Sequence, residues 1–191
     1  MRRGEIEMIF NEKLSQLAFK DYATMLNAAC GFVAIALFLS NQREAGMVLV
    51  VIAAALDFLD GKIARLIGKD SSNDFGRELD SLADAISFGA APAALVLADH
   101  GLEMLPLVVA VFYLCAGITR LALFNLQGKD EKGVYRGMAI PIAALVVVAS
   151  HAFLFPYSLA ITFLAALAML AAFKYSKKGL KKATHLPLVF D

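Results

Sequence analysis

Charged residues are scarce in this chain: they make up 18% of its 191 residues, whereas 60% are hydrophobic. A soluble domain of this size usually has about a quarter of its residues charged and about half apolar. The apolar excess is concentrated in several nearly continuous segments of ~17–23 residues, which is the length that a helix needs to cross a bilayer. The composition therefore excludes an ordinary soluble domain and indicates an integral membrane protein.

Cysteines are few, and repeats and targeting signals are not evident. The two cysteines, Cys30 and Cys115, lie in apolar segments, so we expect no disulfide framework and interpret both as small hydrophobic residues. Residues 1–20 mix acidic and basic side chains without an apolar core, and we expect no cleavable signal peptide. His100, His151 and His185 are scattered along the chain, and we assign them no role.

The apolar segments predict an all-α fold, a bundle of six transmembrane helices. Their expected ranges are 22–40, 45–67, 76–98, 104–127, 137–155 and 157–175. The connections are short and polar, as in NQREAG, or turn-like, as in FPYS, so no soluble domain fits between them. We expect three parts: an N-terminal segment over residues 1–21, a six-span domain over 22–175, and a basic tail over 176–191.

The N-terminal segment carries apolar residues at helical spacing, among them Ile6, Ile9, Phe10, Leu14 and Leu17. This pattern predicts an amphipathic helix that lies on the membrane interface, with a solvated leader as the alternative. The tail SKKGLKKATHLPLVFD is basic enough to favour anionic lipid headgroups. A simpler interpretation of the tail is that its charge only helps to set the membrane topology.

The positions of lysine and arginine predict the orientation. Basic residues surround the N-terminal segment, the second and fourth connections and the tail, whereas the three opposite connections contain only Arg43 of the 18. Cytoplasmic loops carry the excess of lysine and arginine. We therefore expect an even number of spans with both termini on the cytoplasmic side.

Four aspartates lie inside or beside segments apolar enough for a membrane. Asp57 and Asp60 are three residues apart in the second expected helix, and Asp80 and Asp84 are four apart in the third. Each pair shares one helix face, and both pairs lie toward the cytoplasmic ends of their helices. Two adjacent antiparallel helices therefore bring four carboxylates together.

Such carboxylates are costly, because a charge at the bilayer centre costs ~2.5–3.5 kcal/mol on insertion scales. Neighbouring Lys62, Arg65 and Arg77 could neutralise some of them in a structural ion-pair cluster, but apolar packing is often as stable as such a cluster. A set of ligands made only of oxygen atoms suits a hard cation such as Mg²⁺ or Mn²⁺. The sequence therefore favours a metal site.

The spacing of these residues resembles a known signature. The run from Asp57 reads D-x-x-D-G-x-x-A-R, and the run from Gly76 reads G-x-x-x-D-x-x-x-D, as in the CDP-alcohol phosphatidyltransferase family. The resemblance implies an enzyme in which two divalent cations, Mg²⁺ or Mn²⁺, bind the diphosphate of a CDP-lipid. An alcohol then displaces CMP, and the product is a phosphodiester.

The resemblance also implies roles for individual residues. The metal ligands that it implies are four carboxylates: Asp57, Asp60, Asp80 and Asp84. Asp84 is in addition the general base that takes the proton of the attacking hydroxyl. CDP-lipid binding falls on Thr24, Asn27, Gly61, Ala64, Arg65 and Gly76. Small residues for helix packing are the alternative interpretation of Gly61 and Ala64 taken singly.

The segment FGRELDSLADAISFGAAPA, residues 75–93, resembles the phosphatidylserine synthase branch of the family, which implies L-serine as the acceptor. For its carboxylate we expect a contact with Arg120, with Arg136 as a second candidate cation and Asn125 as a neutral partner, although Arg120 alternatively snorkels to the interface. Leu123 and Ala139 depart from the branch pattern, which has arginine and proline at these positions.

We therefore expect a membrane enzyme that transfers a phosphatidyl-type group from a CDP-lipid, diacyl or diether, to L-serine. Glycerol 3-phosphate or inositol phosphate is the alternative acceptor. An ion or proton transporter is less favoured, because carriers show broken helices or related halves; a membrane scaffold does not explain the aspartate spacing. The expected partners are these substrates and membrane lipids, with no nucleic acid. The resemblance leaves a homodimer open.

Overall fold

The computed structural model describes residues 19–66, 74–127, 134–135, 137–171 and 175–176. At residues 19–21, 60–66, 74–75, 126–127, 134–135 and 175–176 it describes the backbone alone. The helices are α2 (Phe19–Leu39), α3 (Arg43–Leu66), α4 (Asp74–Asp84), α5 (Ala91–His100), α6 (Met104–Gln127), α7 (Ile140–Phe153) and α8 (Ser158–Leu170). A π-helix, η1 (Ala85–Ala90), joins α4 to α5, and a 3₁₀ turn, η2 (Phe155–Tyr157), precedes α8. Two short antiparallel strands, β1 (Val134–Tyr135) and β2 (Tyr175–Ser176), pair with each other.

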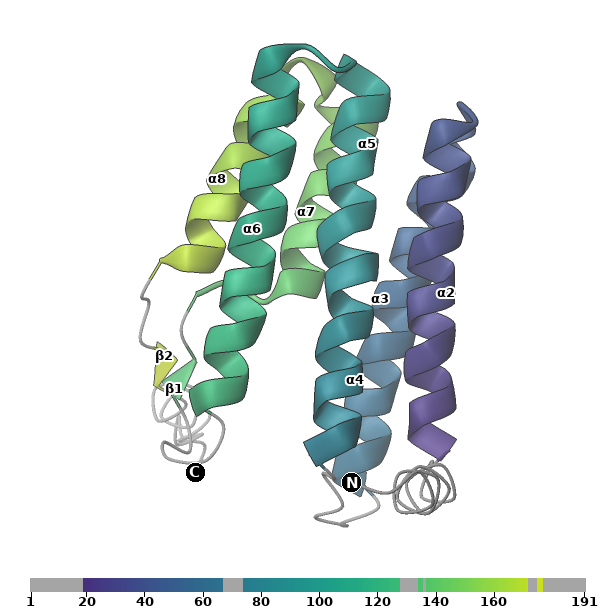
Figure 1. Cartoon of the computed structure of the whole chain (residues 1–191), viewed down its shortest axis with the longest axis vertical. Coiled ribbons are helices and arrows are strands. Elements are labelled where there is room, and N and C mark those ends of the chain that lie inside the picture. The colour runs from purple at the N-terminus through teal and green to yellow at the C-terminus, as the bar shows by residue number, and fades with distance from the viewer. Residues whose placement is uncertain (1–18, 67–73, 128–133, 136, 172–174, 177–191) are drawn as a thin grey trace, which may run out of the picture.

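The helices form a bundle around one continuous rod made of α4, η1 and α5 (Figure 1). Helix α2 packs along α3 and against all three parts of this rod. On another side α6 packs against η1 and α5, and α7 contacts η1, α5, α3 and α8. Because η1 touches α2, α3, α6 and α7, the middle of this rod lies at the centre of the bundle.

Residues with a positive φ lie in three of the connections between helices. Helices α2 and α3 are joined by residues 40–42, where Asn41 has a φ of 59°. Asparagine tolerates this left-handed conformation better than most residues do. Gly101 and Gly137, with φ values of 77° and 73°, lie in the connections before α6 and α7. Glycine adopts such angles without steric cost, so each turn has a residue suited to its backbone.

Three helical segments are long and apolar enough to cross a membrane among the residues that the structure describes: Tyr22–Leu39, Gly76–His100 and Met104–Asn125. This result confirms the helical class and membrane association, but it does not confirm the expected count of six spans. Helix α3 carries too many charges, including Asp57 and Asp60, and α7 and α8 have only 14 and 13 residues. A bilayer needs about 20 apolar residues.

The last two helices are shorter than the expected 137–155 and 157–175 for local reasons. Helix α7 begins only at Ile140, because Gly137 has a positive φ and Pro141 occupies the first turn, where proline is preferred. Helix α8 ends at Leu170, and Ala171 is extended with a ψ of 131°. The expected amphipathic helix and almost all of the basic tail lie outside the described residues.

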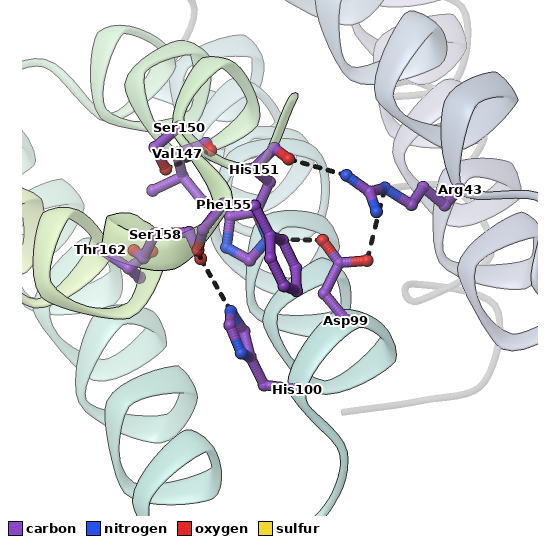
Figure 2. Close-up of polar contacts among 9 residues, drawn as sticks. All are labelled: Arg43, Asp99, His100, Val147, Ser150, His151, Phe155, Ser158 and Thr162. Atoms are coloured by element: carbon purple, nitrogen blue, oxygen red, sulfur yellow. Dashed lines mark hydrogen bonds and ion pairs between the residues drawn. The ribbon is translucent and has the colours of Figure 1, made fainter. Parts of the chain in front are cut away.

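At the end of the bundle opposite the aspartates, polar side chains from four helices form a distal cluster (Figure 2): Arg43, Asp99, His100, His151 and Ser158. Asp99 of α5 accepts a hydrogen bond from His151 Nδ1 of α7 at 2.7 Å, and Arg43 Nε of α3 lies 3.5 Å from its other oxygen. Arg43 also donates to the backbone carbonyl of His151 at 2.7 Å. The cluster thus ties α3, α5 and α7 together.

A second set of contacts in the distal cluster joins α5 to α8. The His100 ring stacks on Phe155 with ring centroids 4.9 Å apart. The Ser158 hydroxyl donates its proton to the carbonyl of Phe155 at 2.7 Å. It therefore accepts from His100 Nε2, which lies 2.7 Å away. The sequence assigns His100 and His151 no role, and the structure places both in the distal cluster with Asp99.

We predict that Asp99→Asn lowers the free energy of unfolding, because the Asp99 side chain is only 4% exposed and pairs with both Arg43 and His151. Hydrogen bonds to charged groups contribute ~1.5–3 kcal/mol each, and we expect a loss in that range in detergent-solubilised protein. Glu103→Gln is the control, because Glu103 is exposed near the same end. Equal losses in the two variants would contradict a stabilising role for the cluster.

Candidate active site

Carboxylates from the second half of α3 and the last turns of α4 converge. Asp57 of α3 and Asp80 and Asp84 of α4 each place a carboxylate oxygen within 4.8 Å of the others. Asp80 and Asp84 lie one helical turn apart and therefore share a face. We call these three residues the aspartate cluster. Asp60 lies one turn beyond Asp57 on α3, and its side chain is not described.

The three carboxylates differ in their environment. Asp84 is buried, with 8% of its surface exposed, whereas Asp57 is half-buried and Asp80 is exposed. Asp84 Oδ1 has no hydrogen-bond partner among the described residues. Negative charges so close together repel each other, by about 4 kcal/mol per pair at 4 Å and an effective dielectric constant of about 20. The arrangement is therefore one that a bound cation stabilises.

The donor set of the aspartate cluster fits a hard divalent cation. Asp57, Asp80 and Asp84 supply only oxygen atoms, and an unpartnered Asp84 oxygen remains for a ligand bond. Mg²⁺ and Mn²⁺ prefer such ligands, whereas softer metals favour sulfur or imidazole. The family resemblance implies two ions, and the fit shown by the described residues concerns three of the four predicted ligands.

Helix α2 covers the buried side of the aspartate cluster. Asn27 is 2% exposed, and its side chain forms a hydrogen bond with Asp84. Thr24 lies one turn before it and is 6% exposed. Both residues were predicted to bind the CDP-lipid, and the structure places Asn27 directly on Asp84. Asn27 therefore forms part of the wall of the site, and Thr24 lies one turn away on the same face of α2.

The other predicted CDP-lipid residues lie near the ends of α3 and α4. Gly61, Ala64 and Arg65 belong to the last turns of α3, of which the backbone alone is described. Gly76 is buried in the first turns of α4, four residues before Asp80. The helices thus place all four at the same end of the bundle as the aspartate cluster.

Arg120 of α6 lies beside the aspartate cluster, and its positive charge acts on Asp84. Arg120 Nε is buried and has no hydrogen-bond partner among the described residues. The guanidinium lies over the ring of Phe124, with the central carbon 5.6 Å from the ring centroid. A half-buried guanidinium whose Nε has no partner among the described residues suits an anionic group of a substrate. Arg136, the other predicted cation, lies outside the described residues.

Asn125, the remaining predicted acceptor residue, contacts α4 at Ser81 and Glu78, which neighbour Asp80 in the sequence. Its Nδ2 lies 3.0 Å from Ser81 Oγ and 3.5 Å from Glu78 Oε2. Sequence reasoning assigned Glu78 and Ser81 no place in the site. Their spacing of three residues on a helix that also carries Asp80 and Asp84 is the signal that could have indicated this polar face.

The fold and the site together define a helical membrane protein with an acidic, metal-compatible centre. Residues 20–174 match the sequence profile described as CDP-alcohol phosphatidyltransferase. The chain belongs to this family, as its aspartate motif indicates.

Several relatives carry more specific names. The chain is 34% identical over 142 residues to an archaetidylserine synthase of Methanothermobacter thermautotrophicus, which covers 73% of this chain and 60% of that protein. It is similar to CDP-diacylglycerol–serine O-phosphatidyltransferases of Methanocaldococcus jannaschii, with 39% identity over 132 residues, and of Bacillus subtilis, with 34% over 127 residues. These alignments cover 69% and 65% of this chain and 59% and 70% of the relatives. The chain thus spans less than two thirds of each archaeal relative.

We predict that Asp57→Asn, Asp60→Asn and Asp80→Asn each weaken Mn²⁺ binding by roughly tenfold or more, since even indirect partners of a metal ligand contribute 10–100-fold. Electron paramagnetic resonance of free Mn²⁺ in a titration of the purified protein measures this affinity without turnover. Glu103→Gln removes a charge at the opposite end and should bind as the unaltered protein does. Unchanged binding in all three variants would exclude the aspartates as ligands.

Proposed function

We propose that this protein transfers a phosphatidyl-type group from a CDP-lipid to L-serine and releases CMP. The observation that carries this proposal is the convergence of Asp57, Asp80 and Asp84 within 4.8 Å beside the cation Arg120. The names of the relatives, which are serine transferases, support serine as the acceptor. Those names include both archaetidyl and diacylglycerol lipids, and the proposal covers both.

The reaction requires one proton to move and one phosphorus–oxygen bond to exchange. The serine hydroxyl oxygen forms a bond to the lipid-linked phosphorus, the bond from that phosphorus to CMP breaks, and the hydroxyl proton leaves. Asp84 takes this proton in our proposal, because its Oδ1 is buried without a hydrogen-bond partner among the described residues. A base must lie within hydrogen-bond reach of the proton that it removes.

Aspartates hold the metal in this proposal, and other residues bind the substrates. Asp57, Asp60 and Asp80, together with Asp84, would hold two divalent cations, Mg²⁺ or Mn²⁺. When bound, such ions neutralise a diphosphate and polarise the phosphoryl group under attack. Nucleotide binding falls on Thr24, Asn27, Gly61, Ala64, Arg65 and Gly76, as the family resemblance implies.

Serine itself needs a cation for its carboxylate and acceptors for its ammonium group. Arg120 is the cation for the carboxylate, because its Nε is buried with no partner among the described residues. Asn125 is a neutral partner from the same helix, and Arg136 is a second candidate cation.

The membrane arrangement is part of the proposal. In this proposal six helical segments cross the bilayer. Three are the segments long and apolar enough to span it, and the other three are α3, α7 and α8. Support comes from the alternating directions of the helices in Figure 1 and from the basic residues, of which the opposite connections contain only Arg43. Both termini and the aspartate cluster then face the cytoplasm, with residues 5–20 on the interface. A homodimer stays a prediction.

CMP release tests the proposed reaction directly. Purified protein with CDP-diacylglycerol or its diether analogue should release CMP when L-serine is added, and chelation of divalent cations should stop the release. Asp84→Asn should mainly lower kcat, because a neutral amide cannot accept the hydroxyl proton. Release with glycerol 3-phosphate or inositol phosphate but not with serine would overturn the acceptor, and no release with any alcohol would overturn the enzyme.

Arg120→Ala should raise the KM for serine roughly ten- to a hundredfold, because a charged hydrogen bond contributes ~1.5–3 kcal/mol. The KM for the CDP-lipid should change little. Arg120→Lys keeps the charge but loses the planar pair of donors. Its KM for serine should therefore lie between that of the unaltered protein and that of Arg120→Ala. If serine reacts and neither substitution changes its KM, serine is still the acceptor, but Arg120 does not bind its carboxylate.

Residue accessibility tests the topology. Single cysteines at Ser72 and Gly179, in a background without Cys30 and Cys115, should react with a membrane-impermeant thiol reagent from the cytoplasmic side. A cysteine at Asn41 should react from the other side. Labelling of positions 41 and 72 from the same side contradicts the proposed arrangement.

A further inference from the structure

The π-helix η1 begins directly after Asp84, and proline accounts for part of its backbone pattern. In an α-helix the carbonyl of Phe88 accepts from the N–H of residue 92, but residue 92 is proline and has no N–H. The proline ring also clashes with that carbonyl in regular α geometry. The chain instead forms wider turns, and the N–H of Ala91 reaches the carbonyl of Ile86. Such π segments frequently mark functional sites.

Tyr113 of α6 supplies the donor that Pro92 cannot. Its hydroxyl donates to the carbonyl of Phe88 at 2.9 Å, and both residues are fully buried. An unpaired carbonyl in this position would cost about 1–3 kcal/mol. This hydrogen bond therefore fixes the position of η1 along the axis of α6.

Ser87 attaches η1 to α2 on another side. Its hydroxyl donates to the carbonyl of Asn27 at 2.8 Å, and Ser87 is fully buried. The two backbones approach so closely that a Cβ atom on Gly31, one turn after Asn27, would lie 2.5 Å from Ser87 Cα. Glycine is therefore required at this contact, which leaves little room for η1 to shift.

Asn27 connects this contact to the aspartate cluster. Its backbone carbonyl receives the Ser87 hydroxyl, while its side chain forms a hydrogen bond with Asp84. We propose that Ser87 and Tyr113 are positioning residues, which hold η1 so that the carboxylate of Asp84 stays aimed into the site. The expected change in turnover rests on the proposed function. The expected change in metal binding does not, since the orientation of the Asp84 carboxylate affects both.

The tests are Ser87→Ala and Tyr113→Phe, each of which removes one hydroxyl and leaves the rest of the side chain. Ser150→Ala is the matched control for Ser87, because Ser150 is also buried and donates to a backbone carbonyl, that of Val147, at 2.7 Å. Tyr157→Phe is the control for Tyr113, since Tyr157 is exposed in η2. We measure kcat and KM with CDP-lipid and serine, Mn²⁺ affinity without turnover, and thermal stability.

We expect Ser87→Ala and Tyr113→Phe to lower kcat roughly tenfold and to weaken Mn²⁺ binding severalfold, because small misplacements of a reacting group cost up to a hundredfold. The KM for CDP-lipid should stay within about twofold. Ser150→Ala should lose as much thermal stability as Ser87→Ala, with kcat and Mn²⁺ affinity unchanged.

Two results would overturn the inference. One is that Ser87→Ala and Ser150→Ala have the same kcat and Mn²⁺ affinity, which shows that Ser87 acts on stability alone. The other is that Ser87→Ala lowers kcat by the same factor in an Asp84→Asn background, because residues that act through one another are not additive. Failure of the unaltered protein to use serine would overturn the proposed function instead, and the Mn²⁺ measurement would still decide the role of Ser87 and Tyr113.

Discussion

Mutual repulsion among the clustered carboxylates governs how the surrounding helices must be arranged. Asp57, Asp80 and Asp84 lie within 4.8 Å of one another, and the last of them is buried. A buried charge without a partner is far more costly than an exposed one. The surrounding helices must therefore supply both a cation and a rigid wall, and α6 and α2 do so through Arg120 and Asn27.

The two ends of the bundle differ in how their buried acidic side chains are paired. At the distal end, Asp99 is paired with His151 and Arg43, so its charge is compensated within the protein. At the aspartate end, Asp84 Oδ1 has no hydrogen-bond partner among the described residues. Charge that the protein compensates itself stabilises the fold, whereas charge left open is typical of sites that bind a ligand. This contrast separates the structural acids from those in the candidate active site.

The central rod connects these two ends mechanically. It carries Asp84 just before the π segment η1 and Asp99 near the end of α5. Four helices contact η1, and close-packed interiors transmit small displacements rather than absorbing them. Substitutions in η1 can therefore affect the aspartate cluster through packing alone.

The helical class, the membrane association, the family and the pairing of acids on two helices could all be predicted from the amino-acid sequence, because each depends on spacing within single segments. Helical periodicity places Asp80 and Asp84 on one face wherever the helix lies. Tertiary structure alone decided that Asn27 contacts both Asp84 and Ser87, and that Arg43 meets the carbonyl of His151, 108 residues away. Such contacts depend on how helices pack against one another, and the spacing of residues within one helix does not predict that packing. The lengths of α7 and α8 were misjudged for a related reason, since apolar residues continue past the backbone turns that end these helices.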